Sequence, residues 1–445
     1  MRLTRFIAGG LLWCAAVAGA QQPDSVRRAR TDSIARAVRD SIALMKELGA
    51  AMAPTTPPAA AAPGAPVGTQ TGPTNPRLLP DFSAVGDLVG DLSPQGSTQG
   101  DNSRFGVREV ELAVQAVVDP YFRGDVFLGI SDLEKISIEQ AFLTTTALPN
   151  EFELKIGRYL MPVGKQNTTH RHDLHTIEYP YVIQRFLSDD GLKGTGLWLS
   201  RVFAPFGFYQ ELQLTWVDQF QSPTIEGLVT DVPVNKSLGG MGYSARLRNY
   251  VDINEATNVE LSLSGISGDR QQPLDETYAS LLPRGVNAAI ARQTVVGADL
   301  TFRWRPLQQG LYESFMLQAE LMRQINERSP DIPQASAAAC MTRYGGACPA
   351  DVYLGPTRNY NGAYVFARYQ TSQRTFLGSR YDWVQDPDNA GRTLNAGSVY
   401  LEWYPSEFSK LNAAYEAYKP DGETLLNRIL FQATFSLGPH KPHPF

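Results

Sequence analysis

The chain has 445 residues, a formal net charge of −5 and 19 % charged residues. It contains no basic block and no nucleic-acid recognition motif, so we expect no nucleic acid among its partners. After residue 20, no apolar run reaches the roughly 20 residues that a membrane-spanning helix requires. This composition fits a soluble protein. It fits a transmembrane β-barrel equally well, because barrel strands carry lipid-facing apolar residues only at every second position.

Residues 1–20 are typical of a secretory signal peptide. Arg2 and Arg5 precede an apolar segment at 6–17, and residues 18–20 (Ala-Gly-Ala) offer a small-residue cleavage site. Removal of these two arginines changes the net charge from −5 to −7. The sequence therefore predicts an exported protein.

Two segments of different character follow the signal peptide. Residues 21–49 repeat Asp-Ser every eight residues and carry an apolar stripe through Ile34, Val38 and Ile42, which predicts a short periplasmic helix. Such a helix is marginal alone. It either packs against a partner, as a short coiled coil or on a periplasmic surface, or it is a frayed charged tail. Residues 50–79 are rich in Pro, Ala, Gly and Thr, which predicts a disordered linker.

From about residue 80, apolar and polar residues alternate with a period of two. Val110 and Leu112 fall on one face of their segment, and Glu109 and Glu111 fall on the other. Alternation predicts strands, either of a soluble sandwich or of a barrel. Three features favour the barrel: segments of 10–13 residues, polar faces that repeatedly carry Glu and Arg, and aromatic residues near strand ends.

The alternation divides into sixteen segments, and bacterial single-chain barrels have even strand numbers. The expected strands are 82–92, 105–118, 121–131, 135–147, 151–161, 193–204, 207–218, 240–251, 255–267, 293–305, 312–325, 362–371, 374–385, 394–404, 408–418 and 425–437. Every second connection is short, whereas 162–192, 219–239, 268–292 and 326–361 are long. The sequence therefore predicts an all-β, antiparallel transmembrane barrel over 80–445, with the N-terminal helix and the C-terminus in the periplasm.

The polar faces of these strands would line the lumen with charges of both signs. The expected lumen-facing charges are Glu109, Glu111, Glu211, Arg246, Arg248, Glu260, Arg303, Glu320, Arg368, Arg380 and Glu402.

The stretch from Arg108 to Leu192 resembles the phosphate-selective porin-like (OprP/OprO-like) group of outer-membrane porins. The resemblance is carried by REVELAVQAVVDPYFRGDVFLGI, IEQAFLTT, LKIGRYLMPVGKQN and the histidine-bearing stretch that ends at DDGL. It implies a trimeric passive channel whose third loop folds into the lumen. Phosphate selectivity in that group depends on a ladder of lumen Arg and Lys. The mixed lumen charges here argue against a dedicated anion channel.

Loop 162–192 is the loop that the resemblance places in the lumen. It is long and mixes apolar residues with charges of both signs, as a pore constriction requires. The candidate constriction residues are Lys165, Arg171, Asp173, Glu178, Arg185, Asp189 and Asp190.

His170, His172 and His175 lie within six residues of one another in this loop. Three imidazoles beside Asp173 would suit a divalent metal ion. The alternative is hydrogen-bonded packing of the loop against the wall without a metal. His440 and His443 in the tail form a weaker pair. Apart from this possible metal ion, we expect no cofactor.

Cys340 and Cys348 both lie in the longest predicted loop. An exported protein passes through an oxidising compartment, so we expect a disulfide between them. A metal site is the alternative, but no histidine lies nearby in the sequence.

No nucleophile elbow or other catalytic constellation singles out a serine, so we expect no enzyme. The preferred hypothesis is an outer-membrane porin that gives passive diffusion of small hydrophilic solutes or ions, as a homotrimer in contact with outer-membrane lipid and lipopolysaccharide. Two alternatives stay open. One is a metal-linked channel or receptor that uses the loop histidines, and the other is a structural envelope tether through the N-terminal helix.

Overall fold

A computed structural model describes residues 80–99, 102–131, 135–218, 220, 238–274, 281–328, 334–387 and 392–438. All of the described residues belong to one compact unit, Pro73–Phe445. The predicted signal peptide (1–20), helix (21–49) and linker (50–79), and the tail histidines His440 and His443, lie outside the described residues.

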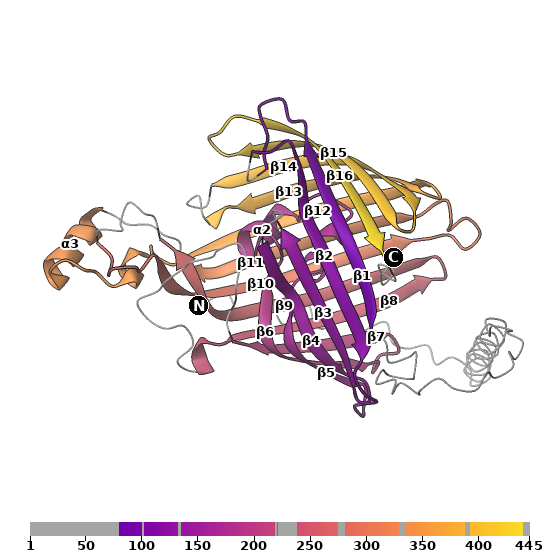
Figure 1. The fold of residues 1–445 in the computed structure, drawn as a ribbon, viewed down its shortest axis with the longest axis horizontal. Helices are drawn as coiled ribbons and strands as arrows, with labels where there is room; N and C mark the ends of the chain where they lie inside the picture. Colours follow the sequence, from indigo (N-terminus) through magenta and orange to yellow (C-terminus); the bar gives the residue numbers. More distant parts are fainter. Residues whose placement is uncertain are drawn as a thin grey trace, which may run out of the picture. The chain divides into compact units, whose positions relative to one another are not determined.

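Sixteen antiparallel strands close into a barrel (Figure 1), which confirms the predicted fold class. Their bounds are β1 Asp81–Asp91, β2 Phe105–Val117, β3 Phe122–Ser131, β4 Lys135–Thr145, β5 Phe152–Leu160, β6 Lys193–Phe203, β7 Tyr209–Val217, β8 Gly242–Asn254, β9 Thr257–Pro273, β10 Ala288–Trp304, β11 Phe315–Glu327, β12 Arg358–Ser372, β13 Thr375–Gln385, β14 Thr393–Ser406, β15 Ser409–Pro420 and β16 Leu426–Leu437. β1 closes the barrel by pairing with β16. Closure removes the free edges whose polar backbone would otherwise face lipid.

The two faces of each strand differ in polarity, as β7 illustrates. Leu212, Leu214 and Trp216 point outward and are exposed, whereas Gln213 and Thr215 point into the barrel and are buried. Exposed large apolar side chains recur on outward faces all round the barrel. An outer surface of this kind is suited to contact with hydrocarbon.

The long connections alternate with short turns. Short turns join β2 to β3, β12 to β13 and β14 to β15, whereas 161–192, 218–241, 274–287 and 328–357 are long. β9 and β10 run for 17 residues each and so extend beyond the predicted ends at 267 and 293. Their extension packs against the disulfide-bearing segment, because Ala289 and Ala291 share an apolar cluster with Cys340 and Cys348.

The described helices are short. They are η2 Gln166–Thr168, η3 Arg171–Asp173, α2 Tyr181–Phe186, η4 Leu238–Gly240, α3 Gln334–Tyr344 and η6 Ala350–Tyr353. A disulfide joins Cys340 in α3 to Cys348. Within the described part of the chain, no helix has the length and apolar character needed to cross a membrane.

Three irregularities interrupt the ladder near the N-terminal strands, and one is a register shift of β3 with β4 between Phe127 and Leu128. The register of β1 with β2 shifts between Asp87 and Leu88, and the shift turns Arg108 inward, where it binds Asp87. β4 and β5 pair over only four residues, from Ala141–Arg158 to Thr144–Lys155, whereas β5 and β6 pair over nine.

Residues 161–192, called the inner loop below, fold into the barrel, and α2 lies within its outline in Figure 1. α2 contacts β12 and β13. Val182, Ile183 and Phe186 of the loop share a buried apolar cluster with inward residues such as Tyr364 and Val384. The inner wall is therefore apolar where the loop covers it, unlike the polar lining that alternation alone predicts.

Leu199→Arg and Ser200→Arg place the same charge at neighbouring positions of β6, on opposite faces. Leu199 is exposed on the outward face, so an arginine there should cost about 2–4 kcal/mol near the bilayer midplane. Ser200 lies opposite Glu153 on the inward face, so an arginine there gains a carboxylate partner and should cost much less. Urea titration of folding into lipid vesicles measures both. Equal losses in the two variants would contradict the assignment of faces.

Candidate functional site

The inner loop begins at a fixed point on the barrel wall. Gly164 has a φ of +62°, and a Cβ at this position would collide with the Glu320 carboxylate on β11. The next two backbone amides, of Lys165 and Gln166, both donate to Glu320 Oε1 at 2.8 Å. The Tyr364 hydroxyl donates to the same oxygen at 2.8 Å. Glycine therefore lets the backbone approach closely enough for a buried carboxylate to bind it.

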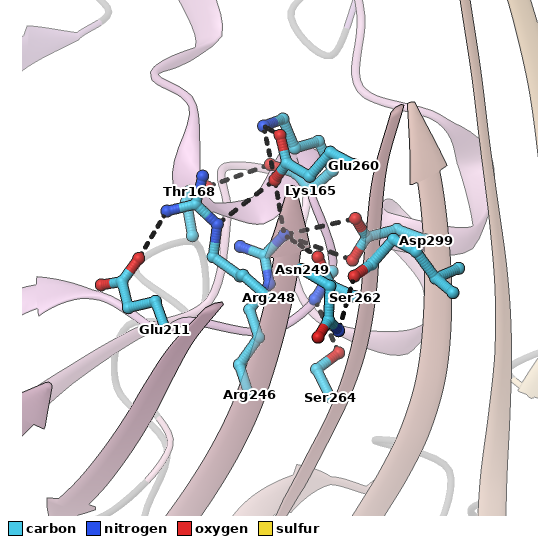
Figure 2. Close-up of polar contacts among 12 residues, drawn as sticks. Lys165, Thr168, Glu211, Arg246, Arg248, Asn249, Glu260, Ser262, Ser264 and Asp299 are labelled. Carbon is cyan, nitrogen blue, oxygen red and sulfur yellow. Dashed lines mark hydrogen bonds and ion pairs between the residues drawn. The ribbon is translucent and has the colours of Figure 1, made fainter. Parts of the chain in front are cut away.

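Glu260 on β9 is the centre of an ion-pair cluster between the inner loop and the wall (Figure 2). Lys165 Nζ lies 2.9 Å from Glu260 Oε2, and Arg248 Nε on β8 lies 3.2 Å from Oε1. Arg303 and Arg246 approach the same carboxylate at 3.7 and 4.0 Å. Four cations therefore surround one buried anion, which fixes Lys165 against the wall.

The cluster also contains two further carboxylates. Arg248 Nη1 lies 2.7 Å from Glu211 Oε2, and Arg246 Nη2 lies 3.2 Å from Asp299 Oδ2. The members differ in their contact with water: the side chains of Lys165 and Arg248 are 22 % and 28 % exposed, whereas Glu260 is 3 % exposed. The most exposed side chains of the cluster are therefore those of the cations Lys165 and Arg248.

The same asymmetry recurs in other pairs that line the lumen. Arg123 is 36 % exposed beside Asp125, which is 4 % exposed. Arg368 is also more exposed than its partner Glu402. The Lys155–Glu153 and Lys193–Asp190 pairs are exceptions, because in each the carboxylate is the more exposed member.

The middle of the inner loop is bound by side chains of β13 and β15. Arg380 Nη1 donates to Thr176 Oγ1 at 2.9 Å and to the carbonyl of Glu178 at 2.7 Å. Lys410 Nζ donates to the carbonyls of His172 and Leu174 at 2.7 and 2.8 Å. Wall cations thus satisfy loop carbonyls that would otherwise be buried without partners.

Glu178 links the inner loop to β2. Its carboxylate lies 2.5 Å from Arg171 Nη2 and 3.6 Å from Arg108 Nη1, and Arg108 also donates to the Ile177 carbonyl at 2.9 Å. Burial alone would raise the pKa of Glu178, but Arg171 and Arg108 outweigh burial and lower this pKa to about 2.

The three loop histidines do not converge. His170 Nδ1 lies 2.8 Å from Glu111 Oε2, and His172 Nε2 lies 3.0 Å from Asp173 Oδ1. Burial disfavours the charged form of His172, but Asp173 and neighbouring carboxylates raise its pKa to about 9. His175 stacks on Phe366 and lies 3.6 Å from Glu402; burial and the nearby Arg368 lower its pKa.

Donor atoms of His170 and His172 lie together with a carboxylate oxygen of Glu111, not with His175. The structure thus brings Glu111, and not His175, beside His170 and His172. The reason is that Phe366 and Glu402 on the wall hold the ring of His175.

The other expected constriction residues lie at the far end of the inner loop. Arg185 Nε is 3.5 Å from Asp386 Oδ2, Asp190 is 2.6 Å from Lys193 Nζ, and Asp189 is exposed.

The charges expected in the lumen lie on inward faces. Sequence reasoning missed Asp87, Arg108, Lys410, Asp382 and Glu416 as partners of the loop or of its anchors. Arg108 turns inward only because of a bulge, which alternation does not predict.

No family model matches the chain. A protein of Aquifex aeolicus described as "Uncharacterized protein" is 26 % identical over 357 residues, which cover 77 % of this chain and 70 % of that protein. Among solved structures, the trimer form of OmpT, an outer membrane protein of Vibrio cholerae, matches with a TM-score of 0.50 and 10 % identity, covering 81 % of this chain and 99 % of that chain. The outer membrane channel DcaP of Acinetobacter baumannii matches with a TM-score of 0.49 and 10 % identity, covering 81 % and 97 %. The match to OmpT shows that the fold is that of an outer-membrane barrel.

Gly164→Ala should loosen the start of the inner loop, because the added Cβ collides with the carboxylate of Glu320 and because alanine is strained at positive φ. We expect faster hydrogen exchange at the Lys165 and Gln166 amides and noisier single-channel currents. Gly397→Ala is the matched control, because a Cβ there meets nothing within 4 Å. Unchanged exchange at Lys165 in Gly164→Ala would contradict the anchoring by Glu320.

Glu178→Gln tests the ion pairs of the inner loop through their pH dependence. Since the pKa of Glu178 falls from 4.5 to about 2, its charge stabilises the fold above pH 4.5, and this contribution is lost as the pH falls through about 2. The variant should lose on the order of 3 kcal/mol of unfolding free energy at pH 7. Urea denaturation in detergent should show the two proteins converging near pH 2. A difference that stays constant from pH 7 to pH 2 argues against this role.

Proposed function

We propose that this protein is an outer-membrane channel for passive diffusion of small hydrophilic solutes or ions. The observation that carries the proposal is the path of the inner loop across the lumen. The loop binds Glu111 and Arg108 of β2, Lys410 of β15 and Arg380 of β13. It also binds Glu260 of β9, which lies opposite β2 in the strand order of the barrel. A polar passage narrowed in this way sorts solutes by size and charge.

The accessible charge of the passage supports a weak preference for anions. Carboxylates such as Glu260 are buried under the cations that bind them, and the heads of Lys165, Arg248 and Arg303 keep contact with water. At this cluster a passing ion therefore meets arginine and lysine first, although the charged residues of the lumen as a whole are of both signs. The preference should weaken at high salt, since the Debye length falls from about 10 Å at 0.1 M to about 3 Å at 1 M.

Reversal potentials across a planar bilayer in a potassium chloride gradient test this preference. In the wild type, we expect a reversal potential whose sign indicates chloride selectivity. The double variant Arg248→Gln/Arg303→Gln should give a smaller reversal potential. In this variant Lys165 and Arg246 still neutralise Glu260. Arg292→Gln is the control, because Arg292 is half exposed on an outward face and pairs with Asp269. Cation selectivity in the wild type, or no change in the double variant, would refute the anion preference. A folded protein without stepwise conductance would refute the channel itself.

We further propose that three copies of the chain assemble around β4 and β5. Arg158 faces outward beside Ile156 and donates to the carbonyl of Ile138 at 2.9 Å, where the ladder between β4 and β5 ends. The matched OmpT structure is described as a trimer form. Chemical cross-linking in native membranes tests the assembly, with dimers and trimers expected to disappear in Arg158→Glu.

The rest of the outward face would contact outer-membrane lipid and lipopolysaccharide through its apolar side chains. The even number of strands places both ends of the barrel on one side, which we propose is the periplasm.

A further inference from the structure

Three donor side chains meet at one point of the lumen wall. Glu111 extends inward from β2, and His170 and His172 come from the inner loop, with one donor atom of each within 4.8 Å of the other two. The closest pair is His170 Nδ1 and Glu111 Oε2 at 2.8 Å. The two imidazole rings lie 5.5 Å apart with a tilt of 35°. Segments far apart in the sequence thus bring two nitrogens and one oxygen together.

Neighbouring groups hold these side chains in place. The Gln140 amide contacts His170 Nε2 at 2.7 Å, so Nδ1 is the nitrogen that faces Glu111. The ring of Phe127 packs 5.3 Å from that of His170. Lys410 binds the His172 carbonyl at 2.7 Å, which fixes the backbone beneath the second imidazole. Supporting contacts of this kind orient ligands and contribute substantially to metal affinity.

We propose that Glu111, His170 and His172 form a binding site for a divalent transition-metal ion of the zinc or nickel class. Two imidazoles and one carboxylate are ligands that these ions prefer, whereas magnesium and calcium prefer oxygen alone. Donor atoms around a tetrahedral zinc ion stand about 3.3 Å apart, so shifts of about 1.5 Å or less would complete the set. Three protein ligands leave a fourth position for water.

The site is reachable from the lumen and lies between two elements whose relative position sets the width of the passage. His170 is 22 % exposed, whereas Glu111 and His172 are 3 % exposed. An ion bound there joins the inner loop to β2 and adds positive charge to the passage. Zinc binding should therefore lower the cation conductance and reduce the motion of the inner loop.

Isothermal titration calorimetry of the folded protein, purified without a histidine tag, tests the site. We expect one zinc ion per chain, a measurable response to nickel, and no response to magnesium. Glu111→Gln and His172→Gln should each weaken zinc binding about tenfold or more. His175→Gln is the matched control, because His175 has the same chemistry three residues away but binds Phe366 and Glu402 instead. His440→Gln/His443→Gln controls for the tail.

Three results would overturn the proposal: no zinc binding by the wild type, equal loss in His175→Gln and His172→Gln, or complete loss in the tail variant. Glu111→His guards against a folding defect in Glu111→Gln, since a third imidazole should retain zinc binding; a folded Glu111→His that binds none also counts against the site. Calorimetry does not depend on the channel proposal. A protein that binds zinc as expected but never conducts would refute the channel and support the site.

Discussion

One constraint governs this structure: a chain inside a hydrocarbon layer must pair its backbone N–H and C=O groups internally. An open sheet leaves two edges unpaired, and the pairing of β1 with β16 removes them. Closure then gives each strand one face toward lipid and one toward the lumen. Apolar side chains are exposed on the outside for this reason, and charged side chains such as Glu111, Glu260 and Glu402 are buried inside.

The inner loop meets the same constraint at the centre of the barrel. Its backbone is covered by the wall, so its amides and carbonyls need partners from the wall. Glu320 accepts two loop amides, Lys410 donates to two loop carbonyls, and Arg380 donates to a third. Much of the charge in the lumen therefore holds the loop. The apolar inner wall beneath α2 has the same origin, since it buries Val182, Ile183 and Phe186.

The reach of the side chains explains why the most exposed groups around Glu260 are cations. Glutamate and aspartate are short, so their carboxylates stay near the wall, whereas arginine and lysine extend their charged heads toward water. Glu260 lies beneath Lys165, Arg248 and Arg303 in this way. Formal charge counts treat buried and exposed groups alike, but a solute in the passage responds mainly to the exposed ones.

The sequence alone determined the strands, their number and the inward faces of residues such as Glu260 and Arg246. These features follow from local periodicity, which each strand carries by itself. Only the tertiary structure decided which groups meet, because the partners lie far apart in the chain. Lys165 and Glu260 are separated by 95 residues in the sequence. Lys410 donates a hydrogen bond to the carbonyl of His172, which lies 238 residues away. The inward turn of Arg108 and the meeting of Glu111 with His170 and His172 likewise depend on a bulge and on the path of the loop, which leave no periodic trace in the sequence.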